Sequence, residues 1–566
     1  MSALRFSKTS VRSVTTMQRK ALTEFLRWAL VVLFAFASAS CTKVGLQTTP
    51  QSSFGIPGTL RYADIQEVSN LNPLLRLEAV GTDLDMFIYG LFFNLDDKER
   101  WVPELATVVP TLANGGISKD GLTITYHLRK GVKWQDGAPF TSRDVVFTTK
   151  AILNPRNNLQ TRNGWDHIAR VEPVGDYEVR FHLKSIYAPA IAQFFSESGQ
   201  YPILPAHLLE KYPDINHVPF NTHPIGTGPF KFVRWVHGDR IELEANPLYW
   251  RGPPKLKHII YKIIPKDTTI LVQLQTHEVD AWFRAPSNLY PEIKKLKGYR
   301  VQLEPSNLFA HIDLNQKNPL FNDVRVRRAI NYAIDKHRIV DNISHGVNIV
   351  AATNQGEFSW AYNPNVMRFD YDPQKARALL DAAGWTMGPS GVRTKNGQKL
   401  TFNLSSVAGG ATGEAVESLI QQELKDVGIA AKVKNYPANI FFAGFQDGGI
   451  LQTGKYDAGF FSWVAGVDPG DEYSLYACDQ FPPVGQNNLY WCDRRLHEAE
   501  KAGLLSYDQN VRKKSYAITQ EEIASQSVTV LLYFARQIYV TSPNLIGFVP
   551  APATTSNWNT WEWSMR

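Results

Sequence analysis

Short motifs that mark common enzyme classes are missing from this sequence. It has no G-x-S-x-G nucleophile elbow, no H-E-x-x-H zinc pair, no Walker phosphate loop and no complete dinucleotide-binding fingerprint. Gly226-Thr227-Gly228 is a partial match, but Pro229 follows it, so this segment indicates a turn. The 13 histidines are scattered and never recur at a spacing of four residues, so we expect no metal site and no cofactor. These absences favour binding over catalysis.

Most of the chain also lacks net charge. The formal charge is +7, but residues 1–40 hold six Lys or Arg side chains against Glu24, which leaves +2 for the remainder. A general nucleic-acid binder needs a concentrated Lys/Arg surface, and no such run occurs. We therefore expect no nucleic-acid partner.

No apolar run is long enough to span a bilayer. The longest one, Trp28 to Ala39, has 12 residues where about 20 are needed, which disfavours a retained membrane helix. It follows a basic leader and precedes small residues, which is the order of a secretory signal peptide over residues 1–40. Ser38-Ala39-Ser40-Cys41 resembles a bacterial lipobox with Ser38 in place of the usual Leu, whereas Ala37-Ser38-Ala39 suits plain cleavage. Residues 41–57 are then a flexible tether behind a lipidated Cys41.

Cysteine is scarce, with three residues in 566. An exported protein meets an oxidising compartment, where an even set of cysteines usually pairs. Cys478 and Cys492 can close one loop, which leaves Cys41 for the lipid. The alternative is two free thiols.

The remaining sequence alternates short strands with helices. A chain of this length exceeds one hydrophobic core, so at least two lobes are expected. Apolar residues alternate with period two in three predicted strands, and they recur every three or four residues in three predicted helices. The strands are 122–128, 177–183 and 240–244, and the helices are 326–339, 373–383 and 415–427, the last leading into a strand at 429–433. The strand-rich part ends near residue 310, where we place the lobe boundary.

Five segments of this sequence, in the same order along the chain, are similar to segments of one known protein family. They resemble the family 5 extracellular solute-binding proteins, the dipeptide- and oligopeptide-binding proteins of ABC importers, over roughly residues 58 to 540. The blocks are Val102-Pro103-Glu104-Leu105-Ala106 through Thr141-Ser142-Arg143-Asp144-Val145; Pro224-Ile225-Gly226-Thr227-Gly228-Pro229-Phe230 with Asn246-Pro247-Leu248-Tyr249-Trp250; Val326 to Lys336; Ala376 to Trp385; and Tyr456-Asp457 to Trp463.

The resemblance implies an α/β fold with two lobes, of the periplasmic-binding-protein type, joined by a hinge. An extra strand-rich subdomain is expected in the first lobe at about residues 90–225. With the boundary near 310, the first lobe is 58–310, the second is 311–534, and residues 535–566 return to the first. The pair Cys478 and Cys492 looks like the loop disulfide of the dipeptide-binding branch.

The resemblance also implies a function. The chain is expected to capture peptides or peptide-like solutes between its lobes and to deliver them to an ABC permease and its ATPase. It would be a monomer in the periplasm or at the cell surface, held by a lipid on Cys41. The alternatives are an oligosaccharide or nickel chelate as solute, a sensory or chaperone-like role for the same fold, and, less favoured, a secreted hydrolase.

The expected ligand residues come mainly from the resemblance. In peptide-binding relatives an Asp shortly after the Trp that matches Trp463 pairs with the peptide ammonium, whereas this chain has Ala465 or Gly466 there. Asp468 could take that role only if its loop shifts. The predicted pocket residues are Trp463, Asp468 and Asn488 from the second lobe, with Asn72 and Tyr89 from the first. The acidic run Asp468 to Glu472 does not match the ligand spacing of a calcium loop, and it is interpreted as a solvated turn, with a ligand contact as the alternative.

Overall fold

The computed structural model describes residues 55–76, 80–159, 162–196, 201–552 and 557–566. A large mixed sheet runs through this part of the chain, in the strand order β17-β16-β18-β11-β19-β10-β1-β9-β8-β7, with β12 beside β19. The leader, Cys41 and most of the predicted tether lie outside the described residues. The strands are β1 (Thr59–Asp64), β7 (Phe230–Val236), β8 (Arg240–Ala245), β9 (His258–Ile263), β10 (Ala281–Ala285), β11 (Arg300–Leu314), β12 (Ile349–Val350), β16 (Thr401–Val407), β17 (Ala430–Tyr436), β18 (Ala458–Val464) and β19 (Thr529–Thr541).

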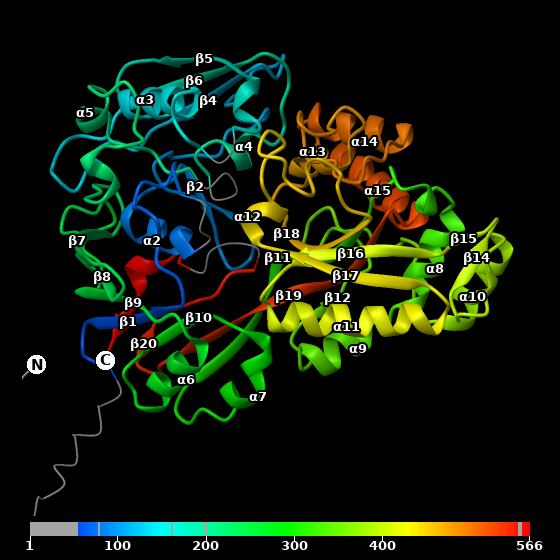
Figure 1. Cartoon of the computed structure of the whole chain (residues 1–566). Helices are drawn as coiled ribbons and strands as arrows, with labels where there is room; N and C mark the ends of the chain where they lie inside the picture. The colour runs from blue at the N-terminus through cyan, green and yellow to red at the C-terminus, as the bar shows by residue number, and fades with distance from the viewer. Residues whose placement is uncertain (1–54, 77–79, 160–161, 197–200, 553–556) are drawn as a thin grey trace, which may run out of the picture. The chain divides into compact units, whose positions relative to one another are not determined.

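Two long strands, β11 and β19, pass from one lobe to the other (Figure 1). Their outer halves, 300–305 and 536–541, pair beside β10, whereas residues 308–314 of β11 pair with β18 in the second lobe. Between these halves the register jumps from Pro305↔Arg536 to Phe309↔Phe534, so three residues of β11 lie opposite Ala535. Such a bulge bends a strand and interrupts its ladder. The predicted lobe limits at 310 and 534 therefore fall within continuous strands.

A small sheet and a helix form the expected strand-rich part of the first lobe. The sheet has the order β4-β6-β5, and α3 (Ser142–Leu153) packs on it (Figure 1). The strands are β4 (Thr123–His127), β5 (Ile168–Pro173) and β6 (Glu178–Leu183). The predicted strands 122–128, 177–183 and 240–244 are thus confirmed as β4, β6 and β8. The Thr141 hydroxyl accepts from the Arg143 amide, while Asp144 accepts from the Thr141 amide, which is a capping box.

Gly226 and Gly228 lie where the chain crosses the end of α2 (Val80–Ile88). A Cβ on Gly226 would lie 1.8 Å from the carbonyl oxygen of Ile88, so only glycine permits this close approach. The Gly228 amide donates to the same carbonyl. The G-x-G segment is therefore a packing element rather than a phosphate loop.

The second lobe carries helices on its part of the sheet. The predicted helix 326–339 is broken into α8 (Val324–Ala333), α9 (Lys336–Arg338) and a π-helical turn (Ile339–Ile343). The break occurs because Asp335 leaves the helix to cap α9, where its carboxylate accepts from the Arg338 amide. The other two helices are confirmed as α10 (Pro373–Ala382) and α11 (Ala411–Asp426), which begins four residues before the predicted start.

Separate hydrophobic clusters fill the two lobes. One gathers buried side chains from residues 60 to 283, and another gathers them from residues 310 to 533. Trp563, near the C-terminus, lies in the first cluster, with its ring 5.9 Å from those of Phe87 and Phe283. The end of the chain therefore completes the core of the first lobe.

The remaining elements border these cores. Cys478 and Cys492 form a disulfide, as predicted, just before α14. Within the described ranges no helix has the length and apolarity to cross a membrane. The elements are α4 (Ala190–Gln193), α5 (Ala206–Leu209), α6 (Asp267–Gln275), α7 (Tyr290–Ile293), α12 (Ala438–Phe441), α13 (Tyr473–Tyr476), α14 (Arg494–Leu504) and α15 (Gln509–Gln526), with β2 (Phe93–Leu95), β3 (Trp101–Pro103), β13 (Thr386–Met387), β14 (Arg393–Lys395), β15 (Gln398–Lys399), β20 (Leu545–Ile546) and β21 (Ser564–Met565).

Candidate functional site

Two adjoining cavities are lined by residues from both lobes. The empty space at the smaller is about 290 Å³ and at the larger about 1590 Å³, and both values include space open to solvent. Glu99 and Val467 line both, so the cavities meet there. The smaller is lined by Glu99, Asn307, Asn354, Gln355, Gly356, Phe358, Ser359, Ala465, Gly466, Val467 and Phe534. The larger is lined by Leu95, Lys98, Glu99, Trp101, Val109, Pro110, Thr111, Leu112, Ala113, Ile117, Ala188, Ile191, Ala192, Trp360, Val467, Asp468, Tyr507, Gln509 and Arg512.

Direct contacts hold the lobes together beside these cavities. The Ala188 amide donates to the Leu504 carbonyl at 2.8 Å, and the Tyr507 hydroxyl donates to the Gly121 carbonyl at 3.1 Å. Leu504 is the last residue of α14, and Tyr507 lies in the segment that joins α14 to α15, on the second-lobe side of the larger cavity. The cavities therefore form a cleft that the lobes close.

The wall of the smaller cavity is fixed by hydrogen bonds between distant loops. Asn307, in the bulge of β11, accepts from the Ala465 amide at 3.1 Å. Asn354 donates from Nδ2 to Glu472 at 2.6 Å, and the Asn354 Oδ1 has no partner in the described part of the chain. The smaller cavity therefore lies beside the place where β11 and β19 pass from one lobe to the other.

Glu99 reaches this cleft from the turn between β2 and β3. Its backbone has φ +56°, a conformation that non-glycine residues rarely adopt, and its amide donates to the Asp96 carbonyl. The carboxylate of Asp96 accepts from the amides of Lys98 and Arg100, which fixes the turn. Burial raises the pKa of Glu99 to about 7. No described residue forms a hydrogen bond or ion pair with its carboxylate.

Asp468 lines the larger cavity, but its carboxylate already forms an ion pair with Arg512. The guanidinium binds both oxygens, with Nη1 at 2.7 Å from Oδ2, and the Gly470 amide donates to Oδ1. Both side chains are largely buried, with exposed fractions of 13% and 9%. This bidentate pair raises the pKa of Arg512 and leaves Asp468 little capacity for a ligand cation.

The prediction of a solvated acidic turn at 468–472 is wrong. Glu472 is buried, and Asp471 accepts from the Gly466 amide at 2.6 Å. Burial raises the pKa of Asp471 to about 7, and it raises that of Glu472 well above its ordinary value. Glu500, fully buried on α14, joins them with a pKa raised to about 8, because burial and the nearby Asp471 both disfavour its charge. This acid cluster, Asp471, Glu472 and Glu500, lies behind the cleft wall and not in solvent.

The other four predicted ligand residues contact the protein itself. Trp463 packs beside Phe309 and Phe534, next to the smaller cavity, and Asn488 accepts from the Tyr456 hydroxyl through its backbone carbonyl. Asn72 and Tyr89 lie in the interior of the first lobe, where Asn72 donates to Asn221 and the Tyr89 hydroxyl donates to the Leu71 carbonyl. Of the five, only Asp468 lines these cavities, so their roles in ligand binding stay predictions.

Glu99 was missed by the sequence reasoning. It lies in the run Asp96-Asp97-Lys98-Glu99-Arg100, which has the composition of an ordinary exposed turn. Nothing in that pattern indicates that the second lobe covers it.

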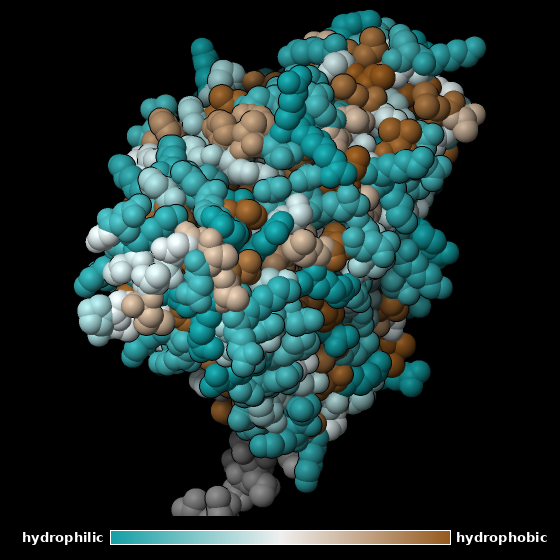
Figure 2. Space-filling model, turned by 90° about the vertical axis from the view of Figure 1, so that its right-hand side faces the viewer, coloured by the Kyte–Doolittle hydropathy of each residue, from teal (hydrophilic) through white to brown (hydrophobic). Residues whose placement is uncertain are grey.

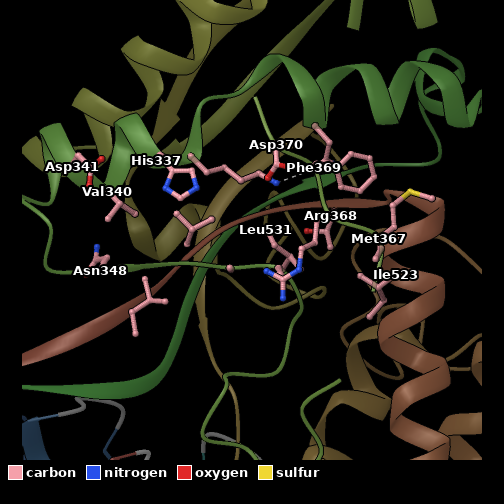
Figure 3. Close-up of a pocket in the computed structure, with 18 of the residues that line it drawn as sticks. His337, Val340, Asp341, Asn348, Met367, Arg368, Phe369, Asp370, Ile523 and Leu531 are labelled. Carbon is pink, nitrogen blue, oxygen red and sulfur yellow. Dashed lines mark hydrogen bonds between the residues drawn. The ribbon is translucent and has the colours of Figure 1, made fainter. Parts of the chain in front are cut away.

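A further hollow lies wholly within the second lobe. Figure 3 shows His337 and Asp341 on one side of it and Met367 and Phe369 on the other. Lys336 also lines it, 3.3 Å from Asn331 Oδ1, and burial lowers the pKa of this ammonium to about 8. All its lining residues come from 331–370 and 523–531, so it is not part of the cleft between the lobes.

No group of three or more His, Cys, Asp or Glu side chains among the described residues is arranged to hold a metal ion.

Comparison with known proteins finds similar proteins over most of the chain. The family model for bacterial extracellular solute-binding proteins, family 5, matches residues 107–481. The oligopeptide-binding protein AppA of Bacillus subtilis is 29% identical over 543 residues, which are 94% of this chain and 97% of AppA. The crystal structure of AppA with a nonapeptide has a TM-score of 0.74 and 27% identity, covering 90% of this chain and all of that one. NikZ of Campylobacter jejuni, solved in complex with Ni(L-His), has a TM-score of 0.76 and 27% identity at the same coverage.

Proposed function

Because the chain belongs to the family 5 bacterial extracellular solute-binding proteins, as its sequence motifs suggested, we propose that it captures peptides for an ABC importer. It would hold the solute in the cleft and deliver it to a membrane permease with its ATPase. The observation that carries this proposal is the pair of cavities lined by both lobes beside the strands that join them. The likeness to AppA supports a peptide as the solute.

Ligand capture would depend on β11 and β19, the two strands that run from one lobe to the other. The bulges in β11 and β19 interrupt the ladder where the lobes meet, which makes this region the natural hinge. A solute that contacts both walls stabilises the closed arrangement, because only that arrangement offers both sets of contacts. The permease could then recognise the closed protein.

The chain would act outside the cytoplasm as a lipid-anchored monomer. Residues 1–40 would be removed as a signal peptide, and Cys41 would carry the lipid at the head of the tether. An anchor of several acyl chains holds a protein stably on a membrane. The face drawn in Figure 2 is mostly hydrophilic, with apolar residues in separate groups, so this face lacks a large apolar surface for a second copy.

A second candidate is a nonpeptide solute on the same fold, such as a metal chelate or an oligosaccharide. Two observations favour it: NikZ was solved with Ni(L-His), and Arg512 already occupies Asp468. A free peptide ammonium would then lack the partner that the sequence suggested.

Thermal unfolding with a solute panel separates the two candidates. A ligand at 100 times its dissociation constant should add roughly 2.7 kcal/mol to the stability of the protein. The panel contains tri- and tetrapeptides, their N-acetylated forms, oligosaccharides and nickel–histidine. Stabilisation by peptides supports the proposal. Stabilisation by a sugar or the chelate alone would overturn the peptide as the solute, while the protein would still be a solute-binding protein.

A further inference from the structure

We propose that Glu99 is the residue that binds the cationic group of the solute, across the cleft from the 465–467 segment. This inference rests on the proposed function and assigns its specificity to a carboxylate from the first lobe. It identifies the solute as one with a cationic end, such as the free α-ammonium of a peptide.

The smaller cavity is built to accept a positive charge. Glu99 is the single charged side chain among the described residues that line it. Asn354 adds Oδ1, a buried acceptor without a partner among the described residues. The Glu99 carboxylate and the Asn354 amide oxygen are acceptors on two residues that line one small cavity, and an ammonium with three N–H donors can satisfy such acceptors.

Glu99 has the local features of a ligand-binding carboxylate. It is half-buried, and its left-handed backbone holds it in the turn between β2 and β3. No described residue neutralises it, although a carboxylate withdrawn from water without a partner destabilises the protein. The raised pKa of about 7 reflects that burial, with no contribution from a neighbouring charge. A cation in the cavity would supply the missing partner.

The neighbouring charges do not compete for this role. Lys98 is exposed, and the guanidinium of Arg100 is paired with Asp96. In the larger cavity Asp468 and Arg512 neutralise each other. Among the described residues, Glu99 is thus the carboxylate at the junction that has no ionic partner, and a solute anchored there could extend into the larger cavity beside Asp468 and Tyr507.

The test compares the native protein with Glu99→Gln by isothermal titration at pH 7.5, where Glu99 and the α-ammonium of the peptide are both mostly ionised. The probes are a free-amine tetrapeptide without Lys or Arg, its N-acetylated form, and an N-acetylated form that contains lysine. The native protein should prefer the free amine by roughly 100-fold, because a buried charge pair loses about that much when one partner is removed. Glu99→Gln should abolish the preference, while Glu99→Asp should keep part of it.

Glu357→Gln is the matched control, because Glu357 lies in the 354–359 loop but is exposed and does not line the cavity. It should keep the full preference. A preference retained in Glu99→Gln, or an equal affinity of the native protein for free and acetylated peptides, would overturn the inference and leave peptide capture standing. If only the acetylated peptide that contains lysine binds tightly, the cationic group bound by Glu99 is the lysine side chain of the solute and not its α-ammonium. Failure of the native protein to bind any cationic peptide would overturn both the role of Glu99 and the proposal of peptide capture.

Discussion

Replacing Glu500 by glutamine should stabilise the protein at pH 8 and change it much less at pH 5.5. Glu500 is fully buried on α14, and its pKa is raised to about 8 by burial and by the nearby Asp471. An ionised carboxylate is therefore costly in the folded state, whereas glutamine has the same shape and no charge. The effect of the substitution must depend on pH.

The sign follows from the protons that each state binds. In the unfolded chain the Glu500 carboxyl titrates near pH 4.5, and in the folded chain near pH 8, so the folded state binds more protons between these values. The stability contributed by this group is present at low pH and is lost as the pH rises through that interval. The loss amounts to about 1 kcal/mol at pH 5.5 and about 4 kcal/mol at pH 8. Glu500→Gln should therefore gain about 3 kcal/mol more at pH 8 than at pH 5.5.

Urea unfolding of the native protein and the variant at both pH values measures this difference. Glu498→Gln is the control, because Glu498 is exposed on the same helix, and its effect should be small at both pH values. A Glu500→Gln effect that is equal at pH 5.5 and pH 8 would refute the reasoning. It would mean that the folded protein does not disfavour the charged form of Glu500.

Three further substitutions test other parts of the structure. Thr141→Ala removes the cap of α3 and should lower the stability by about 1 kcal/mol in urea unfolding, while Thr141→Ser should restore it. Lys336→Met removes an ammonium whose pKa is lowered to about 8, so the folded state binds fewer protons and the native protein gains stability as pH rises from about 8. The stability difference between this variant and the native protein should therefore change by about 2 kcal/mol between pH 7 and pH 9.5. A difference that stays constant with pH would contradict the lowered pKa of Lys336. Replacing Cys478 and Cys492 by serine opens a loop with a sequence separation of 14 and should cost on the order of 3 kcal/mol, measured against the native protein with its disulfide intact.

Elements defined by local rules could be predicted from the sequence. β4 and β6 show the period-two alternation of half-buried strands, and their buried positions alternate in the structure. α10 begins at Pro373 behind Asp372, whose carboxylate accepts from the Lys375 amide, as the N-cap pattern indicated. Here the deciding contacts lie within a few residues of each other.

Features decided by distant contacts could not be predicted. Asp335 caps α9 locally, but its own amide, freed where α8 ends, donates to Glu423 across 88 positions. The acidic run at 468–472 looks solvated in sequence, but α14 and Asn354 cover it. Arg512 lies 44 positions from Asp468, so no local pattern shows that the expected anchor is already paired. Burial by a distant segment of the chain leaves no signature in the segment that it covers.

The acid cluster and Glu99 should together make solute binding depend on pH in two separable ways. Glu99 lines the smaller cavity and must be ionised to bind a cation, so the affinity for a cationic solute should fall as the pH drops below about 7. Asp471 holds the Gly466 amide of the opposite wall, and its pKa is also about 7, so its protonation weakens that bond and loosens the wall. An uncharged solute would sense the second effect alone. Titrations of charged and acetylated peptides between pH 5.5 and pH 8 should therefore diverge in the native protein and run parallel in Glu99→Gln. Divergence that persists in that variant would place the cation partner elsewhere in the cleft.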